Sequence, residues 1–207
     1  MKTKAVIYII DDEAAIRDSL SLLLDVHGYH VSLFESGPRF LQEIDPAAPG
    51  CVLMDLQMPG MDGLQLLDAM KRAGIRLPVV MMTGFGQVST AVQAMKAGAL
   101  DFLEKPLSET ALLSVLDRAL SDLAANMRLA DQRADAEARL AHLTPREREV
   151  FDRLALGKPN KVIALELDIS PRTVELHRAR VMEKLAAGSL SDLVRLASAI
   201  DQKPGGQ

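Results

Sequence analysis

One stretch decides the fold: Cys51-Val52-Leu53-Met54-Asp55-Leu56-Gln57-Met58-Pro59-Gly60-Met61-Asp62-Gly63. It begins with four apolar residues, which predict a strand buried on both faces. The strand ends on the carboxylate of Asp55, and the Met-Pro-Gly run that follows predicts a loop. Open α/β sheets place their functional groups at the carboxyl ends of parallel strands, so Asp55 is a candidate functional residue. The alternative is an aspartate that only caps the turn after the strand.

Further apolar runs flank this strand and alternate with helical patterns. We expect strands at residues 4–10, 29–34, 51–55, 77–82 and 100–103. The segments between them carry apolar residues at helical spacing, and three of the expected helices stop at Gly28, Gly74 and Gly98. Strands that alternate with helices are typical of α/β proteins, so the first part of the chain is predicted to be a five-stranded, doubly wound parallel sheet.

The strand order of such a sheet predicts a cluster of acids. In the order 2-1-3-4-5 the first and third strands are neighbours, and their ends carry Asp11, Asp12 and Asp55. Carboxylates crowded at one point repel each other unless a hard cation joins them, and oxygen ligands with room for water suit Mg²⁺. Thr83 and Lys105 follow the fourth and fifth strands and add a hydroxyl and an ammonium to the same rim. These groups together are what a phosphoryl acceptor site needs.

Each of these residues also has a local explanation. Asp12 can cap the first helix, Thr83 can be a turn hydroxyl, and Lys105 can be a solvated loop lysine. Their joint placement at the carboxyl ends of strands favours the functional interpretation over independent coincidences.

Residues 4 to about 120 resemble the receiver domain of two-component response regulators. The motifs stand in the family's order and at its spacing: Asp11-Asp12, Asp55 with Met58-Pro59-Gly60, Thr83-Gly84, Phe102 and Lys105-Pro106. The resemblance implies that Asp55 accepts a phosphoryl group from a sensor histidine kinase. It also implies that Mg²⁺ is held by Asp11, Asp12, Asp55 and the backbone carbonyl of Gln57.

The same resemblance assigns roles to three further residues. It implies that Lys105 binds the phosphoryl oxygens, beside a cis Lys105–Pro106 bond. It implies that Thr83 closes onto the phosphate and lets Phe102 turn inward, which reshapes the face of the fourth helix and fifth strand. Many relatives have Tyr where this chain has Phe102, so a contact made by that hydroxyl is missing here.

Composition and charge limit the class of protein. The chain has 207 residues, 48% hydrophobic and 25% charged, which is typical of a globular protein with a core. No apolar run approaches the ~18 residues of a membrane span, and the start of the chain does not resemble a signal peptide, so we expect a cytoplasmic protein without membrane contact. The single cysteine, Cys51, excludes an internal disulfide. Residues 1–142 carry 13 Lys and Arg against 19 Asp and Glu, whereas residues 143–207 carry 11 against 9, which indicates two parts with different roles.

A long helix is predicted between the two parts. There is no proline or glycine between Pro106 and Pro145, and apolar residues recur there at spacings of three or four. They stand at positions 112, 116, 120, 123, 127, 130, 134, 138 and 141. The stripe weakens to alanine after Met127, so a coiled-coil seam between two copies and an unpaired connector both fit it.

The last part of the chain predicts short helices joined by tight turns. Leu143-Thr144-Pro145-Arg146-Glu147 is a capping box with Thr144 as N-cap. A second helix is expected at 160–167, and a third begins after Ser170 and runs to about Leu185. A short helix, a tight turn and a longer capped helix are typical of the helix-turn-helix.

The third of these helices has two different sides. At about 100° per residue, Val174, Val181 and Leu185 fall on one side and are predicted to face the core. The outer side presents Leu176 and Glu175, which fit contacts with a thymine methyl and with cytosine N4. The residues expected to contact DNA are Lys161, Arg172, Thr173, Glu175, Leu176, His177, Arg178, Ala179, Arg180 and Lys184. The alternatives are a plain surface leucine at 176 and a packed histidine at 177.

Residues 143–197 resemble the GerE/LuxR-type DNA-binding domain. The resemblance rests on Leu-Thr-Pro-Arg-Glu-Arg-Glu-Val from residue 143, Asn160-Lys161, Ile163-Ala164, Ile169-Ser170, Thr173-Val174, His177 and Glu183-Lys184-Leu185. It implies that the final helix, at about residues 190–200, pairs two subunits on DNA. The order of the domains and the residues at 169–173 and 187–190 resemble those of the FixJ subgroup. Members of that subgroup activate nitrogen-fixation or low-oxygen genes and work with a FixL-type kinase.

These features predict a domain organisation and a function. We expect a receiver domain at 1–122, a helical linker at 123–142, a helix-turn-helix domain at 143–201 and a disordered tail at 202–207. The predicted function is a two-component response regulator, not an enzyme, in which phosphorylation switches dimerisation and DNA binding to control transcription. Its expected partners are a sensor histidine kinase, double-stranded DNA, RNA polymerase and, when phosphorylated, a second copy of the chain.

Other classes of protein remain as rivals. A metal-dependent phosphohydrolase would use Asp55 as nucleophile, but such enzymes place an acid two residues later, where this chain has Gln57, and no lid insertion is present. A nucleotide switch is disfavoured because no Gly-x-x-x-x-Gly-Lys-Ser/Thr run exists. The second part could also bind protein or RNA in place of DNA.

Overall fold

The structure is a computed structural model, and it describes residues 5–84 and 88–201. The chain divides into two compact units, residues 1–124 and 125–207, and each is treated by itself. The expected disordered tail at 202–207 lies outside the described residues, as does the first residue of the expected strand 4–10. In the described part of the chain, no helix combines the length and the apolar character needed to cross a membrane.

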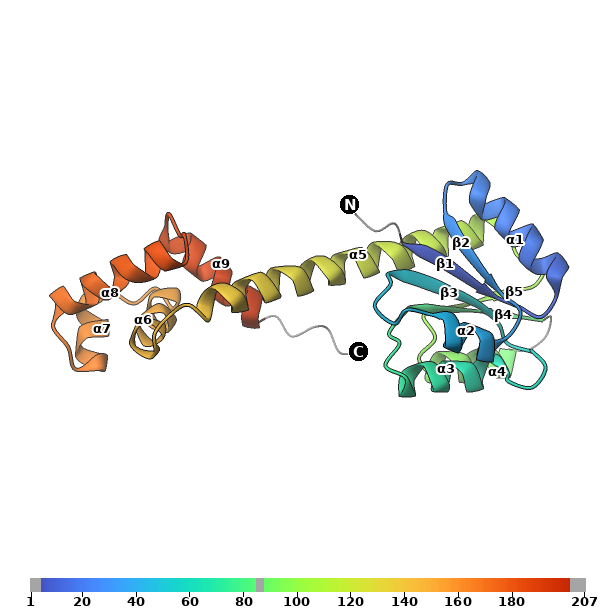
Figure 1. Ribbon diagram of the computed structural model, residues 1–207, viewed down its shortest axis with the longest axis horizontal. Coiled ribbons are helices and arrows are strands. Elements are labelled where there is room, and N and C mark those ends of the chain that lie inside the picture. Colours follow the sequence, from blue (N-terminus) through green and yellow to red (C-terminus); the bar gives the residue numbers. More distant parts are fainter. Residues whose placement is uncertain (1–4, 85–87, 202–207) are drawn as a thin grey trace. The chain divides into compact units, whose positions relative to one another are not determined.

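The first unit is a parallel sheet between two layers of helices. Its strands, in the spatial order β2-β1-β3-β4-β5, are β1 (Val6–Ile10), β2 (His30–Phe34), β3 (Gly50–Asp55), β4 (Val79–Thr83) and β5 (Asp101–Glu104). Its helices are α1 (Ala14–Val26), α2 (Gly37–Glu43), α3 (Gly63–Arg72), α4 (Val88–Lys96) and the start of α5 (Glu109–Leu140). Helices α1 and α5 cover one face of the sheet, and α2, α3 and α4 cover the other (Figure 1). The predicted doubly wound parallel sheet is confirmed.

Strand β3 contributes to both layers of the core. All six of its residues are buried. Cys51 and Leu53 pack in the core beneath α1 and α5, whereas Val52 and Met54 pack in the core beneath α2, α3 and α4. Successive side chains of a strand point to opposite faces, so a strand covered on both sides is apolar along its length. The charged side chain of Asp55 follows at the last position of the strand.

Strands β4 and β5 begin and end one or two residues later than the apolar runs 77–82 and 100–103 predict. Backbone hydrogen bonds set these ends: the carbonyl of Thr83 accepts from the N–H of Lys105 at 2.8 Å, and Thr83 pairs in register with Glu104. The apolar runs could not predict where these two strands end, because the last residue of each strand, Thr83 and Glu104, is polar.

The second unit is a small cluster of helices. It contains the end of α5, then α6 (Pro145–Ala155), α7 (Asn160–Leu167), α8 (Pro171–Lys184) and α9 (Leu190–Asp201). The predicted capping box of α6 is present, and the side chain of Ser170 caps α8 by accepting from the N–H of Thr173 at 3.1 Å. Val150, Phe151, Val174 and Val181 are fully or almost fully buried, and Leu140 of α5 joins the same core.

Candidate functional site

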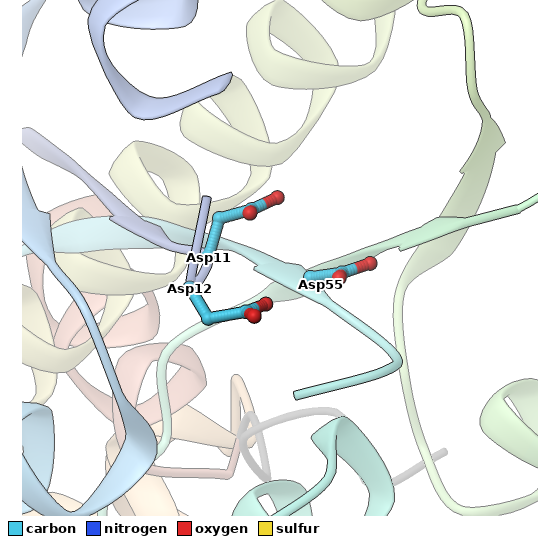
Figure 2. Close-up of side chains that lie close together, drawn as sticks. All are labelled: Asp11, Asp12 and Asp55. Carbon is cyan, nitrogen blue, oxygen red and sulfur yellow. The ribbon is translucent and has the colours of Figure 1, made fainter. Parts of the chain in front are cut away.

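Three carboxylates meet at one edge of the sheet. Asp11 follows β1 directly, and Asp55 ends β3, whose Met54 pairs in register with Ile10. Asp12 is the next residue after Asp11, and one carboxylate oxygen from each of the three acids lies within 4.8 Å of the others. Asp11 and Asp55 are buried whereas Asp12 is exposed. Figure 2 shows the three side chains beside one another, as the strand order predicts.

The ammonium of Lys105 lies among these acids. Lys105 follows β5, and its Nζ lies 2.8 Å from Oδ2 of Asp11 and 3.2 Å from Oδ1 of Asp55. The alternative of a solvated loop lysine is therefore wrong. The peptide bond between Lys105 and Pro106 is cis. Thr83 ends the neighbouring strand β4 and is buried, at 3% exposure.

The electrostatics of the site follow from burial and these contacts. Burial raises the pKa of the Asp55 carboxyl above its ordinary value; the charge of Lys105 opposes the rise, and the charge of Asp11 adds to it. Burial alone would lower the pKa of Lys105, but its hydrogen bond to Asp11 and the charge of Asp55 outweigh that effect, so the pKa is raised. Lys105 is consequently a stable cation at neutral pH.

Two contacts around the acids were not foreseen. Nη1 of Arg17, on α1, donates to the backbone carbonyl of Asp11 at 2.7 Å. Oδ1 of Asp11 accepts from the N–H of Glu13 at 2.9 Å, and Glu13 is the N-cap residue of α1. The alternative in which Asp12 caps α1 is therefore wrong. The sequence held one indication of this contact: Arg17 stands about one turn into the helix that follows Asp11 and Asp12, which places a long cationic side chain near the acids.

The remaining predicted residues of this site differ in exposure. Gln57 is exposed in the loop after β3, and its backbone N–H donates a hydrogen bond to Asp55. Phe102 lies on β5, paired in register with Met81, and its side chain is 42% exposed. Phe102 thus points outward in this structure.

Helix α8 presents the predicted DNA-contacting residues unequally. Its core side is as predicted, with Val174, Val181 and Leu185 buried. The exposed residues of the predicted set are Lys161 on α7 and Arg172, Glu175, Leu176, Ala179, Arg180 and Lys184 on α8. Thr173, His177 and Arg178 are half-buried.

Some of these side chains are held by the protein itself. Nζ of Lys184 lies 2.6 Å from Oε2 of Glu147 and 3.3 Å from the carbonyl of His142. Nη1 of Arg178 donates to Oδ1 of Asn160, at the start of α7, at 3.4 Å. Lys184 thus ties the end of α8 to the start of α6, a role that the sequence did not indicate.

Glu147 is the buried partner in that contact. Its hydrogen bond from Lys184 comes first among the causes that lower its pKa to about 2, followed by the bond from the N–H of Thr144. The residue is 3% exposed and belongs to the capping box of α6. A second contact joins α6 to α7: Nη2 of Arg146, on α6, donates to the carbonyl of Leu167 at the end of α7 at 2.6 Å.

Comparison with known proteins assigns a family to both units. The family model described as the response regulator receiver domain matches residues 7–117. The family model described as bacterial regulatory proteins, luxR family, matches residues 141–197. The chain belongs to the response regulators.

Relatives of this response regulator match it over nearly its whole length. The transcriptional regulatory protein FixJ of Bradyrhizobium diazoefficiens is 48% identical over 197 residues, which cover 95% of this chain and 96% of the relative. FixJ of Rhizobium meliloti is 44% identical over 95% of this chain and 97% of the relative. The tetrathionate response regulatory protein TtrR of Salmonella typhimurium is 42% identical over 92% of this chain and 91% of the relative.

Solved structures agree with this assignment. The response regulator StyR matches with a TM-score of 0.82 at 35% identity, over 94% of this chain and 98% of that one. Full-length FixJ from B. japonicum matches with a TM-score of 0.61 at 47% identity, over 96% of this chain and 98% of that one. The protein is thus a two-component response regulator that controls transcription, and the comparisons give no support to the rival phosphohydrolase.

Proposed function

We propose that Asp55 accepts a phosphoryl group from a sensor histidine kinase, and that this modification controls DNA binding by the second unit. The observation that carries the proposal is the meeting of three carboxylates and the Lys105 ammonium at the carboxyl edge of the sheet. An oxygen of the Asp55 carboxylate forms a bond to phosphorus while the bond between phosphorus and the donor's leaving group breaks. We place this reaction in the cytoplasm, where the target DNA is found.

The acidic residues fit Mg²⁺ as a cofactor. Their oxygens are hard ligands that approach within 4.8 Å of one another, and two of the acids are buried. We propose that Asp11, Asp12, Asp55 and the backbone carbonyl of Gln57 hold the ion. When bound, Mg²⁺ offsets the negative charge of the carboxylates and of the incoming phosphoryl oxygens. Lys105 supplies a further positive charge and donates hydrogen bonds to the phosphoryl oxygens.

Thr83 and Phe102 are proposed to carry the signal away from Asp55. A phosphorylated side chain carries roughly −1.5 to −2 charges, and the hydroxyl of Thr83, on the strand next to β3, is suited to donate to a phosphoryl oxygen. Movement of Thr83 toward the phosphoryl group would leave space on β4 near Met81. Met81 pairs in register with Phe102 of the adjacent strand β5. The inward turn of Phe102 then changes the face formed by α4 and β5 and favours a homodimer.

The exposed side of α8 is proposed to enter the major groove of double-stranded DNA. Leu176 is 52% exposed on the outer side of α8, so its side chain is accessible for contact with an apolar group such as a thymine methyl. Glu175 is proposed to accept from cytosine N4, and Arg180 to contact the backbone. The other residues proposed at this interface are Lys161, Arg172, Thr173, His177, Arg178 and Ala179. Lys184 supports the interface by fixing α8 against Glu147, and RNA polymerase is proposed as the partner on the promoter.

Incubation with a small phosphodonor and Mg²⁺ tests the phosphoacceptor. We expect the wild type to take up one phosphoryl group and Asp55→Asn to take up none. Asp25→Asn, an exposed aspartate of α1, is the matched control and should be labelled like the wild type. Equal labelling of wild type and Asp55→Asn would assign the site elsewhere. Sustained phosphate release from generic phosphomonoesters would favour an enzyme over a regulator.

Selection of bound DNA from random sequence, with and without phosphodonor, tests the second unit. We expect a recovered site with two related halves, as a dimer requires, and tighter binding after phosphorylation. An affinity that does not fall with rising salt would contradict DNA as the ligand.

A further inference from the structure

The peptide between Asp11 and Asp12 decides whether both acids can serve one ion. Successive side chains of a strand point to opposite faces of the sheet, so neighbouring carboxylates meet only where the chain turns out of the strand. Strand β1 ends at Ile10, and oxygens of Asp11 and Asp12 both lie within 4.8 Å of an oxygen of Asp55. Figure 2 shows the three carboxylates directed to the same side. The orientation of this one peptide therefore sets the geometry of the acidic cluster.

The two neighbouring acids are held to different degrees. Asp11 is buried, and its N–H donates to the carbonyl of Phe34 at 3.2 Å. Its carboxylate accepts from the N–H of Glu13 at 2.9 Å and from Nζ of Lys105 at 2.8 Å. Asp12 is exposed, and no hydrogen bond or ion pair with another described residue holds its carboxylate. The position of the Asp12 carboxylate thus depends on the backbone that precedes it.

Arg17 holds that backbone. It is half-buried in the first turn of α1, and its Nη1 donates to the carbonyl oxygen of Asp11 at 2.7 Å. This oxygen belongs to the peptide that leads into Asp12, so the hydrogen bond restricts the rotation of that peptide. A cation in the first turn of a helix opposes the helix dipole, so this place is unfavourable for an arginine that serves only the helix. The contact also ends on a carbonyl oxygen and leaves the carboxylate oxygens free for a metal ion.

We infer that Arg17 is a positioning residue for the metal site: by holding the carbonyl of Asp11, it keeps the Asp12 carboxylate turned toward Asp55. The inference rests on the proposed function, because it needs Mg²⁺ at these acids. Groups that orient metal ligands from outside the coordination sphere typically contribute about ten- to a hundredfold to metal affinity. Arg17 and Lys105 then act in opposite directions. Lys105 competes with the ion for negative charge, whereas Arg17 arranges that charge for the ion.

Isothermal titration calorimetry of the full chain with Mg²⁺ alone tests the inference without phosphodonor. Arg17→Met removes the donor, Arg17→Gln is too short to reach the carbonyl, and we expect both to bind Mg²⁺ about tenfold more weakly. Arg17→Lys keeps a donor of nearly the same reach and should bind within about threefold of the wild type. Arg76→Met is the matched control and should leave the affinity unchanged. Arg76 is exposed and precedes β4, at the opposite edge of the parallel sheet from the acids.

A double-mutant cycle separates positioning from a general loss of order at the site. If Arg17 acts through Asp12, Arg17→Met should weaken Mg²⁺ binding by less than about twofold in an Asp12→Asn background, because the carboxylate that Arg17 places is gone. The carboxylate of Asp11 has its own hydrogen bonds from Glu13 and Lys105 and should stay in place. An equal loss in both backgrounds would mean that Arg17 supports the whole site and would overturn the inference.

Two further results would also overturn it. Wild-type affinity in Arg17→Met would show that the peptide keeps its orientation without the arginine. A higher affinity would show that Arg17 acts as a competing charge, as Lys105 is expected to do. The proposed metal site and the inference fail separately: a wild type that binds no Mg²⁺ removes both, whereas a wild type and an Arg17→Met protein that bind it equally remove the inference alone.

Discussion

The ammonium of Lys105 lies 3.2 Å from Oδ1 of Asp55, a contact that joins the end of β5 to the end of β3. The same ammonium lies 2.8 Å from Oδ2 of Asp11. A cation that belongs to the chain is thus already placed among the oxygens proposed to hold Mg²⁺. The protein cation and the metal ion compete for the same negative charge, and this competition can be measured.

Lys105→Gln is expected to raise the affinity for Mg²⁺ by about three- to tenfold in the absence of phosphodonor, because a positive charge leaves the acidic cluster. Isothermal titration calorimetry measures the affinity directly. Lys96→Gln, an exposed lysine in the last turn of α4, removes the same charge far from the acids and should leave the affinity unchanged. An unchanged affinity in Lys105→Gln would mean that the ammonium moves away freely when the ion binds.

Asp55→Asn is expected to raise the free energy of unfolding by about 0.5–2 kcal/mol at neutral pH without divalent cations, as substitutions at functional sites often do. Burial raises the pKa of Asp55 in the folded protein, so the ionised carboxylate destabilises the folded state above that pKa. Below the unfolded pKa of about 3.9 the carboxyl is protonated in both states, and the gain should vanish.

Denaturant unfolding at about pH 7 and at about pH 3 measures both limits for Asp55→Asn. Asp25→Asn serves as the control, since Asp25 is exposed and its substitution should change little at either pH. A less stable Asp55→Asn protein at neutral pH would show that the ion pair with Lys105 outweighs the effect of burial.

The acidic cluster could be predicted from the sequence, whereas the contacts that support it could not. Asp11 and Asp55 end apolar runs, and the order of the strands brings those ends together, so a pattern of residue types was sufficient. The bond from Arg17 to the carbonyl of Asp11 depends on the conformation of one long polar side chain on α1. Apolar periodicity places the helix and its buried face, but it does not determine where such a side chain reaches.

In the second unit, too, local features could be predicted from the sequence whereas a contact between distant residues could not. The caps of α6 and α8 and the buried side of α8 follow from local sequence, and the structure has them as expected. The sequence assigned Lys184 to the DNA surface because it is a cation near the end of α8. Its pairing with Glu147, 37 residues away in the chain, depends on how α6 packs against α8, which no local pattern encodes.

Glu147→Gln is expected to lower the free energy of unfolding at pH 7 by about 1–3 kcal/mol, because it leaves the ammonium of Lys184 without its ionic partner. The hydrogen bond from Lys184, together with the one from the N–H of Thr144, lowers the pKa of Glu147 from 4.5 to about 2, so the ionised carboxylate stabilises the folded state above pH 4.5. That contribution is lost as the pH falls from 4.5 to about 2, and the difference between wild type and variant should shrink over that window.

Urea unfolding across that pH window checks the prediction for Glu147→Gln. Glu149→Gln is the control, because Glu149 is exposed and its ion pair with Arg146 should contribute less than about 1 kcal/mol. A difference between wild type and Glu147→Gln that persists at low pH would point to a defect in the capping box instead of the lost charge.

Lys184→Met is expected to leave the salt slope of DNA binding unchanged, although it destabilises the second unit. The ammonium of Lys184 is 2.6 Å from Glu147 and 3.3 Å from the carbonyl of His142, so its charge is already balanced within the protein. Arg180→Met, which removes an exposed cation from the same helix, should lower the slope by about one. Binding constants between about 50 and about 200 mM salt provide both slopes. If the two variants lower the slope equally, Lys184 must leave Glu147 for a phosphate, and the energy of the ion pair with the buried Glu147 would then oppose DNA binding.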